Sequence, residues 1–183
     1  MRLAGELMGF LRVGTPRLFH QKDCLMKTLA DAFEHTLKDI YYAEHAIARA
    51  LPQVVEAISQ SEFKSALLGH LGETKEQIKI LVKVFKTIGV AASGEKCHAI
   101  EGLIKETEGI LSEAKGPVAR NAALAGACQA IEHYEIARYG TLREWAKTLK
   151  NDEAHGLLSE ILDMEKAANN KLNAIAINSL NKD

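Results

Sequence analysis

The sequence predicts an all-α protein, a four-helix bundle with one long crossover between its second and third helices. Apolar residues recur at helical spacing in four long segments, and no segment alternates over the length of a strand. Only the middle connection between these segments is long, so a single domain accounts for the 183 residues. The long helices are expected at residues 29–59, 62–88, 117–149 and 153–179.

The first segment shows how a helix is delimited by its residues. Thr28 followed by Asp31 resembles a capping box, which satisfies backbone N–H groups at a helix start. The apolar stripe that begins at Phe33 continues past Pro52 to Ile58. Since the stripe does not stop at the proline, we expect a kink there and not the end of the helix.

The other long segments carry similar signals at their ends. Ser61 is the expected cap of the second helix, and Gly89 follows its last apolar residue. Pro117 opens the third helix in its first turn, where its missing N–H costs nothing. Asp152 is the expected cap of the fourth.

The lengths of the connections decide the architecture. Short turns join the first helix to the second and the third to the fourth, which makes two antiparallel hairpins. The connector at 89–116 contains five glycines and a short helical pattern at about 97–114. It is long enough to run back along a helix of roughly 40 Å. Two hairpins joined by such a crossover form the ferritin-like arrangement, and a plain up-down bundle with a decorated loop is the alternative.

Composition and charge narrow the class of protein. Hydrophobic residues make up 47% and charged residues 26%, with a net charge of −1. A soluble globular protein is therefore expected, without a membrane span and without a general attraction to nucleic acid. Cys24, Cys97 and Cys128 are too few and too widely spaced for a disulfide framework or a zinc knuckle, which favours a reducing, cytoplasmic setting.

Residues 1–27 differ in character from the rest of the chain. They carry five basic and two acidic residues, a local charge of +3 that leaves −4 for the remainder. Glu6 and two glycines interrupt the apolar residues, so a secretory signal does not fit. We expect an extension upstream of a natural start near Met26, disordered or folded as a short docking helix, and a bundle over 28–183.

Glutamates interrupt the apolar stripes of the long helices. Glu44 and Glu165 lie centrally on the stripes of the first and fourth helices. On the third helix Glu135 is central and Glu132 lies about 60° from it, whereas Glu73 on the second helix lies on a mixed face. Counted from the turns, all five lie roughly 20–28 Å from the end of the bundle, which places them near its middle.

Carboxylates that converge in an apolar interior need cations or protons, because buried like charges repel one another. Two divalent metal ions, iron or manganese, would supply four positive charges and accept such ligands. The sequence has no Glu-x-x-His; His133 is expected on the outer face, and His70 is the one histidine on the inner side. Whether His70 or Gln77 is a ligand is left open. The expected metal ligands are Glu44, Glu73, Glu132, Glu135, Glu165 and His70.

Several segments carry a resemblance to a known family. They include Leu-Lys-Asp-Ile-Tyr-Tyr-Ala-Glu-His at 37–45, Lys-Cys at 96–97 and Glu-His-Tyr-Glu at 132–135. With them, nearly all of residues 26–183 resembles the YciE/YciF family of ferritin-like stress proteins. The resemblance implies a ferritin-like fold, a metal site and a homodimer, and it implies no established reaction.

A homodimer is also indicated by the connector. Its apolar residues offer more hydrophobic surface than one short helix needs, and symmetric pairing is the commonest way to cover such a patch. These residues are Ile100, Leu103, Ile104, Ile110 and Leu111.

Three functional classes compete. The first is a stress-associated protein whose di-metal site acts on peroxide, oxygen or iron, with Tyr41 or Tyr139 as hydrogen-bond donors near the ligands. The second is a non-catalytic, dimeric interaction or structural module whose buried acids are protonated or bridged by water. Protection of nucleic acid is disfavoured by the charge balance, although the +3 extension could act as a weak tail. Whether the protein is an enzyme stays undecided at this stage.

Overall fold

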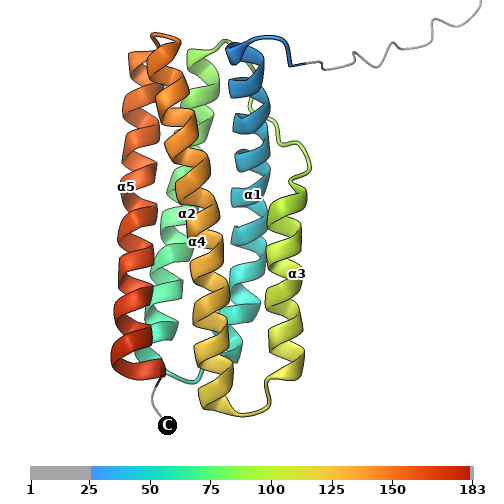
Figure 1. The fold of residues 1–183 in the computed structure, drawn as a ribbon, viewed down its shortest axis with the longest axis vertical. Helices are drawn as coiled ribbons and strands as arrows, with labels where there is room; N and C mark the ends of the chain where they lie inside the picture. Colours follow the sequence, from blue (N-terminus) through green and yellow to red (C-terminus); the bar gives the residue numbers. More distant parts are fainter. Residues whose placement is uncertain (1–25, 182–183) are drawn as a thin grey trace, which may run out of the picture.

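The computed structural model describes residues 26–181, and every element in that part of the chain is helical. Four long helices lie side by side: α1 (Leu29–Ala57), α2 (Ser61–Thr87), α4 (Pro117–Thr148) and α5 (Asp152–Ile175) (Figure 1). A shorter helix, α3 (His98–Glu113), lies in the connector, and a π-helical turn, η1 (Ala176–Leu180), follows α5. The all-helical prediction is confirmed for the described residues. The predicted extension falls almost entirely on residues 1–25, which lie outside them.

Figure 1 shows how the helices are connected. Short turns make α1 and α2, and likewise α4 and α5, antiparallel neighbours, while α2 and α4 run in the same direction. Contacts link α1 to α2, α2 to α5, α5 to α4 and α4 to α1, so the long helices form a closed ring. The connector with α3 runs back along the bundle and packs on α1 and α4. Side chains from all four long helices therefore meet along one central axis.

The start of α1 has the expected cap. The Thr28 side chain accepts a hydrogen bond from the Asp31 backbone N–H at 3.1 Å, and the Asp31 carboxylate accepts one from the Thr28 N–H at 2.9 Å. The helix then continues through the exposed Pro52 to Ala57. The apolar stripe on both sides of the proline holds this turn against the core, and the helix does not end there.

Two of the other predicted caps are one residue off. The caps of α2 and α5 are Gln60 and Asn151, whose side-chain oxygens accept from backbone N–H groups of the first turn, and Ser61 and Asp152 are the first helical residues. Both amides supply the carbonyl acceptor that a helix start requires; asparagine is a favoured cap residue and glutamine is not, so only the Gln60 cap departs from the usual preference. Gly89 has φ of +70° directly after α2, the left-handed conformation that glycine tolerates best.

Apolar side chains fill the interior above and below a polar layer. On α1 the buried residues Phe33, Leu37 and Ile40 precede Glu44, and Ile47 and Leu51 follow it. The same order of apolar, acidic and apolar positions occurs on α4 and α5. Since each buried large apolar side chain contributes about 1.5–3 kcal/mol, the two apolar parts stabilise the bundle on both sides of the acids.

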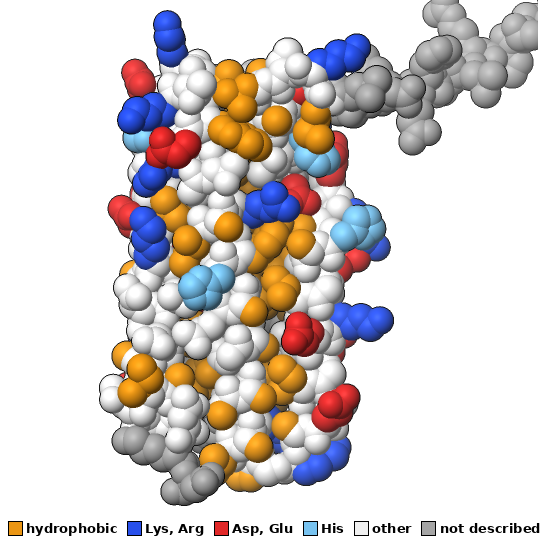
Figure 2. All heavy atoms as spheres, viewed as in Figure 1, with side chains coloured by type: hydrophobic (Ala, Val, Ile, Leu, Met, Phe, Trp, Pro, Cys, Tyr) orange, Lys and Arg blue, Asp and Glu red, His pale blue; other side chains and the backbone are white. Residues whose placement is uncertain are grey.

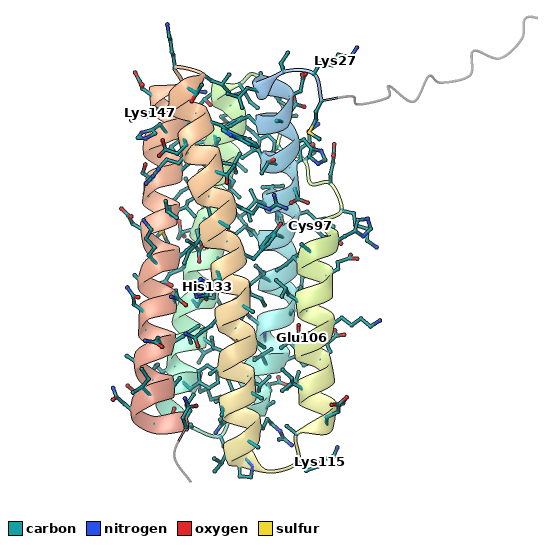
Figure 3. All side chains as sticks on the ribbon, in the orientation of Figure 1. Lys27, Cys97, Glu106, Lys115, His133 and Lys147 are labelled. Carbon is teal, nitrogen blue, oxygen red and sulfur yellow. The ribbon has the colours of Figure 1, made fainter. Side chains whose placement is uncertain are left out.

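The start of α3 is tied to the bundle by a hydrogen-bonded cluster that the sequence did not reveal. Cys97 caps α3, and its sulfur lies 2.9 Å from the Tyr134 hydroxyl of α4. That hydroxyl donates to the Asp39 carboxylate of α1 at 2.9 Å, and the Arg138 guanidinium lies over the Tyr134 ring. Figure 3 labels Cys97 where α3 begins beside α1. Burial raises the pKa of the Cys97 thiol, so this residue acts here as a buried anchor.

The apolar residues of α3 are used in part within the chain. Ile100 is fully buried, and Leu103, Ile104, Ile110 and Leu111 are half-buried against the core. Figure 2 shows hydrophobic side chains along the seam between α4 and α3. Among the described residues, no helix has both the length and the hydrophobicity to cross a bilayer.

Candidate metal centre

Acidic side chains from three long helices lie in the polar layer of the bundle. Glu44 of α1, Glu132 and Glu135 of α4 and Glu165 of α5 are each at most 1% exposed. Their positions on the apolar stripes leave them no direction except inward. The prediction that these four acids face the interior is therefore met by the structure.

The second helix adds a histidine and an amide. His70 is 6% exposed, and its Nε2 lies 3.3 Å from a carboxylate oxygen of Glu132. Gln77, two turns further along α2, is buried and donates its amide N–H to Glu165. The contact of Gln77 was not predicted, although its spacing of seven residues from His70 places both on one face.

These groups come close enough to share a cation. One ligand atom from each of His70, Glu132, Glu135 and Glu165 lies within 4.8 Å of the other three. Glu44 stands beside this group, where it accepts a hydrogen bond from the buried Tyr139 hydroxyl and lies next to the Glu135 carboxyl group.

The two tyrosines expected near the ligands have different surroundings. Tyr139 is fully buried and donates to Glu44. The ring of Tyr41 instead packs edge-on against His45 and Phe85, with ring centres 4.7 and 5.4 Å apart respectively. Only Tyr139 therefore contacts one of the buried acids directly.

Glu73 lies apart from the buried acids. Its side chain is 50% exposed and reaches only the outer nitrogen of His70, with Oε2 3.6 Å from Nδ1. The expectation that it points into the interior is corrected by this placement. The neighbouring Thr74 occupies the buried position at that level of α2, and the longer glutamate side chain reaches water, which spares the cost of burying its charge.

Two further histidines, His133 and His45, lie away from the cluster. His133 is exposed on α4, where Figure 3 labels it, as the sequence predicts. His45 packs on Tyr41, and partial burial lowers its pKa.

Burial controls the protonation of the four inner acids. It raises the pKa of Glu44, Glu132, Glu135 and Glu165, and repulsion from neighbouring carboxylates adds to the rise in the first three. The Tyr139 hydroxyl acts in the opposite direction on the pKa of Glu44, since it donates to the charged form. Glu165 acts on the pKa of Glu132 and Glu44 on that of Glu135, so neighbouring acids in the cluster can share protons. The metal-free cluster is thus expected to keep protons at neutral pH.

Several polar atoms of the cluster have no hydrogen-bond partner. Such atoms are rare in protein interiors, because each one has lost water without gaining a replacement. Five of them come from the residues that approach one another here: Glu44 Oε2, Glu132 Oε2, Glu135 Oε2, Glu165 Oε2 and His70 Nδ1. Carboxylate oxygens with one imidazole are a donor set that iron and manganese accept.

Fold and centre together define a class: an all-helical bundle protein with a buried cluster of carboxylates and one histidine. Residues 28–183 match the family described as a domain of unknown function, DUF892, and the chain belongs to that family. It is 41% identical over 158 residues to Protein YciF of Escherichia coli (strain K12), with 86% of this chain and 95% of YciF covered.

Two solved structures agree with this assignment. The crystal structure of the E. coli stress protein YciF matches with a TM-score of 0.83 and 41% identity, covering 86% of this chain and 100% of that chain. YcfI from Rhodopseudomonas palustris, for which a structural role is suggested, matches with a TM-score of 0.82 and 44% identity, covering 86% of this chain and 99% of that chain. The resemblance to the YciE/YciF family is confirmed.

Proposed function

We propose that this protein is a ferritin-like, stress-associated bundle that binds two divalent metal ions, iron or manganese, in its buried cluster. The observation that carries the proposal is the set of four buried carboxyl groups and one histidine, each with a buried polar atom that lacks a hydrogen-bond partner. Four carboxylates balance the charge of two divalent ions, which removes the cost of burying either set alone. The ferritin-like label is supported by the two hairpins joined by a crossover.

The cluster divides into two sets of ligands. His70, Glu132 and Glu165 would hold one ion, and Glu44 and Glu135 the other, with Glu135 within 4.8 Å of the first set. Bound iron or manganese would supply one-electron chemistry towards peroxide or oxygen, or the ion itself would be the cargo. The chain contributes the buried, acidic interior, and the Tyr139 hydroxyl fixes the Glu44 carboxylate.

Metal stoichiometry tests the proposal. Protein purified without chelator and then loaded with Mn(II), or with Fe(II) in the absence of oxygen, should contain two metal ions per chain by elemental analysis. Glu135→Ala should lower that number, because it removes the acid that both sets approach. Wild-type protein that binds neither ion at micromolar concentration would exclude the metal function.

A second function is favoured by one observation. The relative from R. palustris is the one for which a structural role is suggested, and a non-catalytic helical module with protonated acids would fit that description. In that case the pairs Glu132–Glu165 and Glu135–Glu44 would share protons permanently, and metal would have no effect on stability.

We also propose that the protein is a homodimer. The half-buried apolar residues of α3 and the adjacent seam on α4 give a second copy a surface to cover. Sedimentation equilibrium should give twice the 20.1 kDa mass of the chain. A single species of 20.1 kDa at micromolar concentration contradicts this expectation.

The free thiols of Cys97 and Cys128 suit the reducing conditions of a cytoplasm.

A further inference from the structure

A cavity opens between α2 and α5 and ends on two residues of the buried centre. It has a volume of about 90 Å³. Its inner end is formed by His70 and Glu132, and Glu73 and Lys171 also line it. Both inner residues are more than nine-tenths buried, and each has a polar atom without a hydrogen-bond partner, His70 Nδ1 and Glu132 Oε2.

Small residues on the two facing helices create this cavity. Ala66 of α2 and Ala167 and Ala168 of α5 line it, where larger side chains would close the space between the helices. The volume is enough for a few water-sized molecules or one ion that keeps part of its hydration shell. An extended organic molecule does not fit.

Three potential metal ligands lead from the surface to the centre along this cavity. Glu73 is half-exposed, with a carboxylate oxygen 3.6 Å from His70 Nδ1. The other nitrogen of His70 lies 3.3 Å from Glu132, which is 1% exposed. The imidazole therefore has one nitrogen towards the outer acid and the other towards the inner acid.

The charges along the cavity select the sign of the ligand. Glu73 at the mouth repels an anion and attracts a divalent cation. Such a cation can then replace the protons held by Glu132, Glu135 and Glu165 further in, which an anion cannot do. The ammonium group of Lys171 is the one positive side chain among the described residues that line this cavity, and it opposes the approach of a cation.

We propose that Glu73 and the outer side of His70 form the capture site through which small divalent cations reach the buried centre. This inference rests on the proposed metal function and assigns Glu73 a different part in it. Glu73 binds the arriving ion at the mouth and hands it to His70 and Glu132, and Lys171 slows that step. Glu73 is thus a loading residue and is not a ligand of the loaded centre.

A loading residue and a resident ligand have different kinetic signatures. Removing a loading residue slows both uptake and release and leaves the affinity and the final stoichiometry unchanged, since the bound state does not include it. Removing a resident ligand weakens the affinity and speeds release. The two roles are therefore separated by measuring both rates and the stoichiometry.

The experiment uses the full chain after removal of metal. Uptake of Co(II) is followed by stopped-flow absorption at low salt, release is followed after addition of chelator, and bound metal is counted at equilibrium. Glu73→Gln should slow both uptake and release about tenfold with unchanged stoichiometry, and Lys171→Gln should speed uptake a few-fold, because local charge steers ions.

Two variants remove the same charges elsewhere on the same helices. Glu76→Gln on α2 removes an exposed acid paired with Lys79, and Lys166→Gln on α5 removes an exposed lysine near Asp163. Both should load at rates within about twofold of wild type, since neither lines the cavity. Circular dichroism melts should first establish that all four variants are folded.

Three results overturn the inference. If Glu73→Gln lowers the stoichiometry or speeds release, Glu73 is a resident ligand. If its rates equal those of wild type, or fall only as far as those of Glu76→Gln, ions do not pass through this cavity. If wild-type protein binds no Co(II), Mn(II) or Fe(II) at all, the proposed metal function fails as well, which the first two results leave standing.

Discussion

Glu135→Gln should reverse its effect on stability when metal is added. Without metal the variant should melt at the same temperature as wild type or higher, because it removes an acid that burial and three neighbouring carboxylates keep from ionising. Glutamine has nearly the same shape as glutamic acid, so the packing at this fully buried position is kept. The neutral amide cannot ionise, so the variant also avoids the repulsion that a charged Glu135 would have with Glu165, Glu44 and Glu132.

With metal the order should change. A ligand that binds only the folded state at a thousand times its Kd stabilises by about 4 kcal/mol, which for a domain of this size corresponds to a rise of roughly 10 °C in Tm. Wild type should show this gain with saturating Mn(II), and Glu135→Gln should show a small part of it, since it lacks a carboxylate near both ions. Glu135→Gln should therefore have the same Tm as wild type or a higher one in chelator, and a lower Tm than wild type in Mn(II).

The control is an acid of the same type that the centre does not use. Glu160 is exposed on α5, and Glu160→Gln should follow wild type with and without Mn(II). If wild type gains nothing from Mn(II) over chelator-treated protein, and Glu135→Gln melts at the same temperature or higher in both conditions, the di-metal hypothesis is wrong and the structural module remains.

Local sequence patterns were enough to predict most of the fold. The predicted starts and ends of α1 to α4 agree with the structure within two residues, because Thr28, Gly89 and Pro117 are residues that helix ends favour. The last helix was predicted to reach 179, but it changes to the π-helical turn at Ala176. Residues at both ends of that turn, Ala176 and Leu180, are buried, and a helical period cannot reveal such a local change of hydrogen bonding.

The buried acids could be predicted because they interrupt apolar stripes, and the helical periodicity of a sequence tells on which face of the helix a side chain lies. It does not say how far a long side chain reaches from that face. Glu73 was placed with the inner acids for this reason, whereas the structure brings its carboxylate to the mouth of the α2–α5 cavity. The contact of Gln77 with Glu165 depends on the distance between two helices far apart in the chain, which no local pattern contains.

The stability of the metal-free protein should fall as the pH rises from about 5.5 to 8. Glu44, Glu132, Glu135 and Glu165 have pKa values raised by burial, so the folded cluster keeps protons that the unfolded chain releases above the ordinary glutamate pKa of about 4.3. A group with a raised pKa contributes its full stability below the unfolded pKa. That contribution is lost as the pH rises towards the folded pKa.

Each proton that the folded cluster keeps and the unfolded chain releases lowers the free energy of unfolding by about 1.4 kcal/mol per pH unit. Few groups oppose this. The pKa values of Glu73 and Asp31 are lowered, so these groups change the stability only at more acidic pH than this range. Burial lowers the pKa of His45, so the stability gains a smaller amount as the pH rises through about 6.5. The loss of stability on the alkaline side should therefore dominate the metal-free protein.

Urea unfolding followed by circular dichroism at pH 5.5, 6.5, 7.5 and 8.0, with chelator present, measures this slope. Glu135→Gln should reduce the slope of the unfolding free energy against pH by about 1.4 kcal/mol per pH unit, which is the effect of one proton, and Glu160→Gln should leave the slope unchanged. Bound Mn(II) should remove most of the slope in wild type, because the ions replace the protons and their binding strengthens as the acids ionise. Stability of metal-free wild type that rises with pH over this range would mean that the four acids are already charged in the folded protein, and neither proton pairs nor an empty metal centre would then explain their burial.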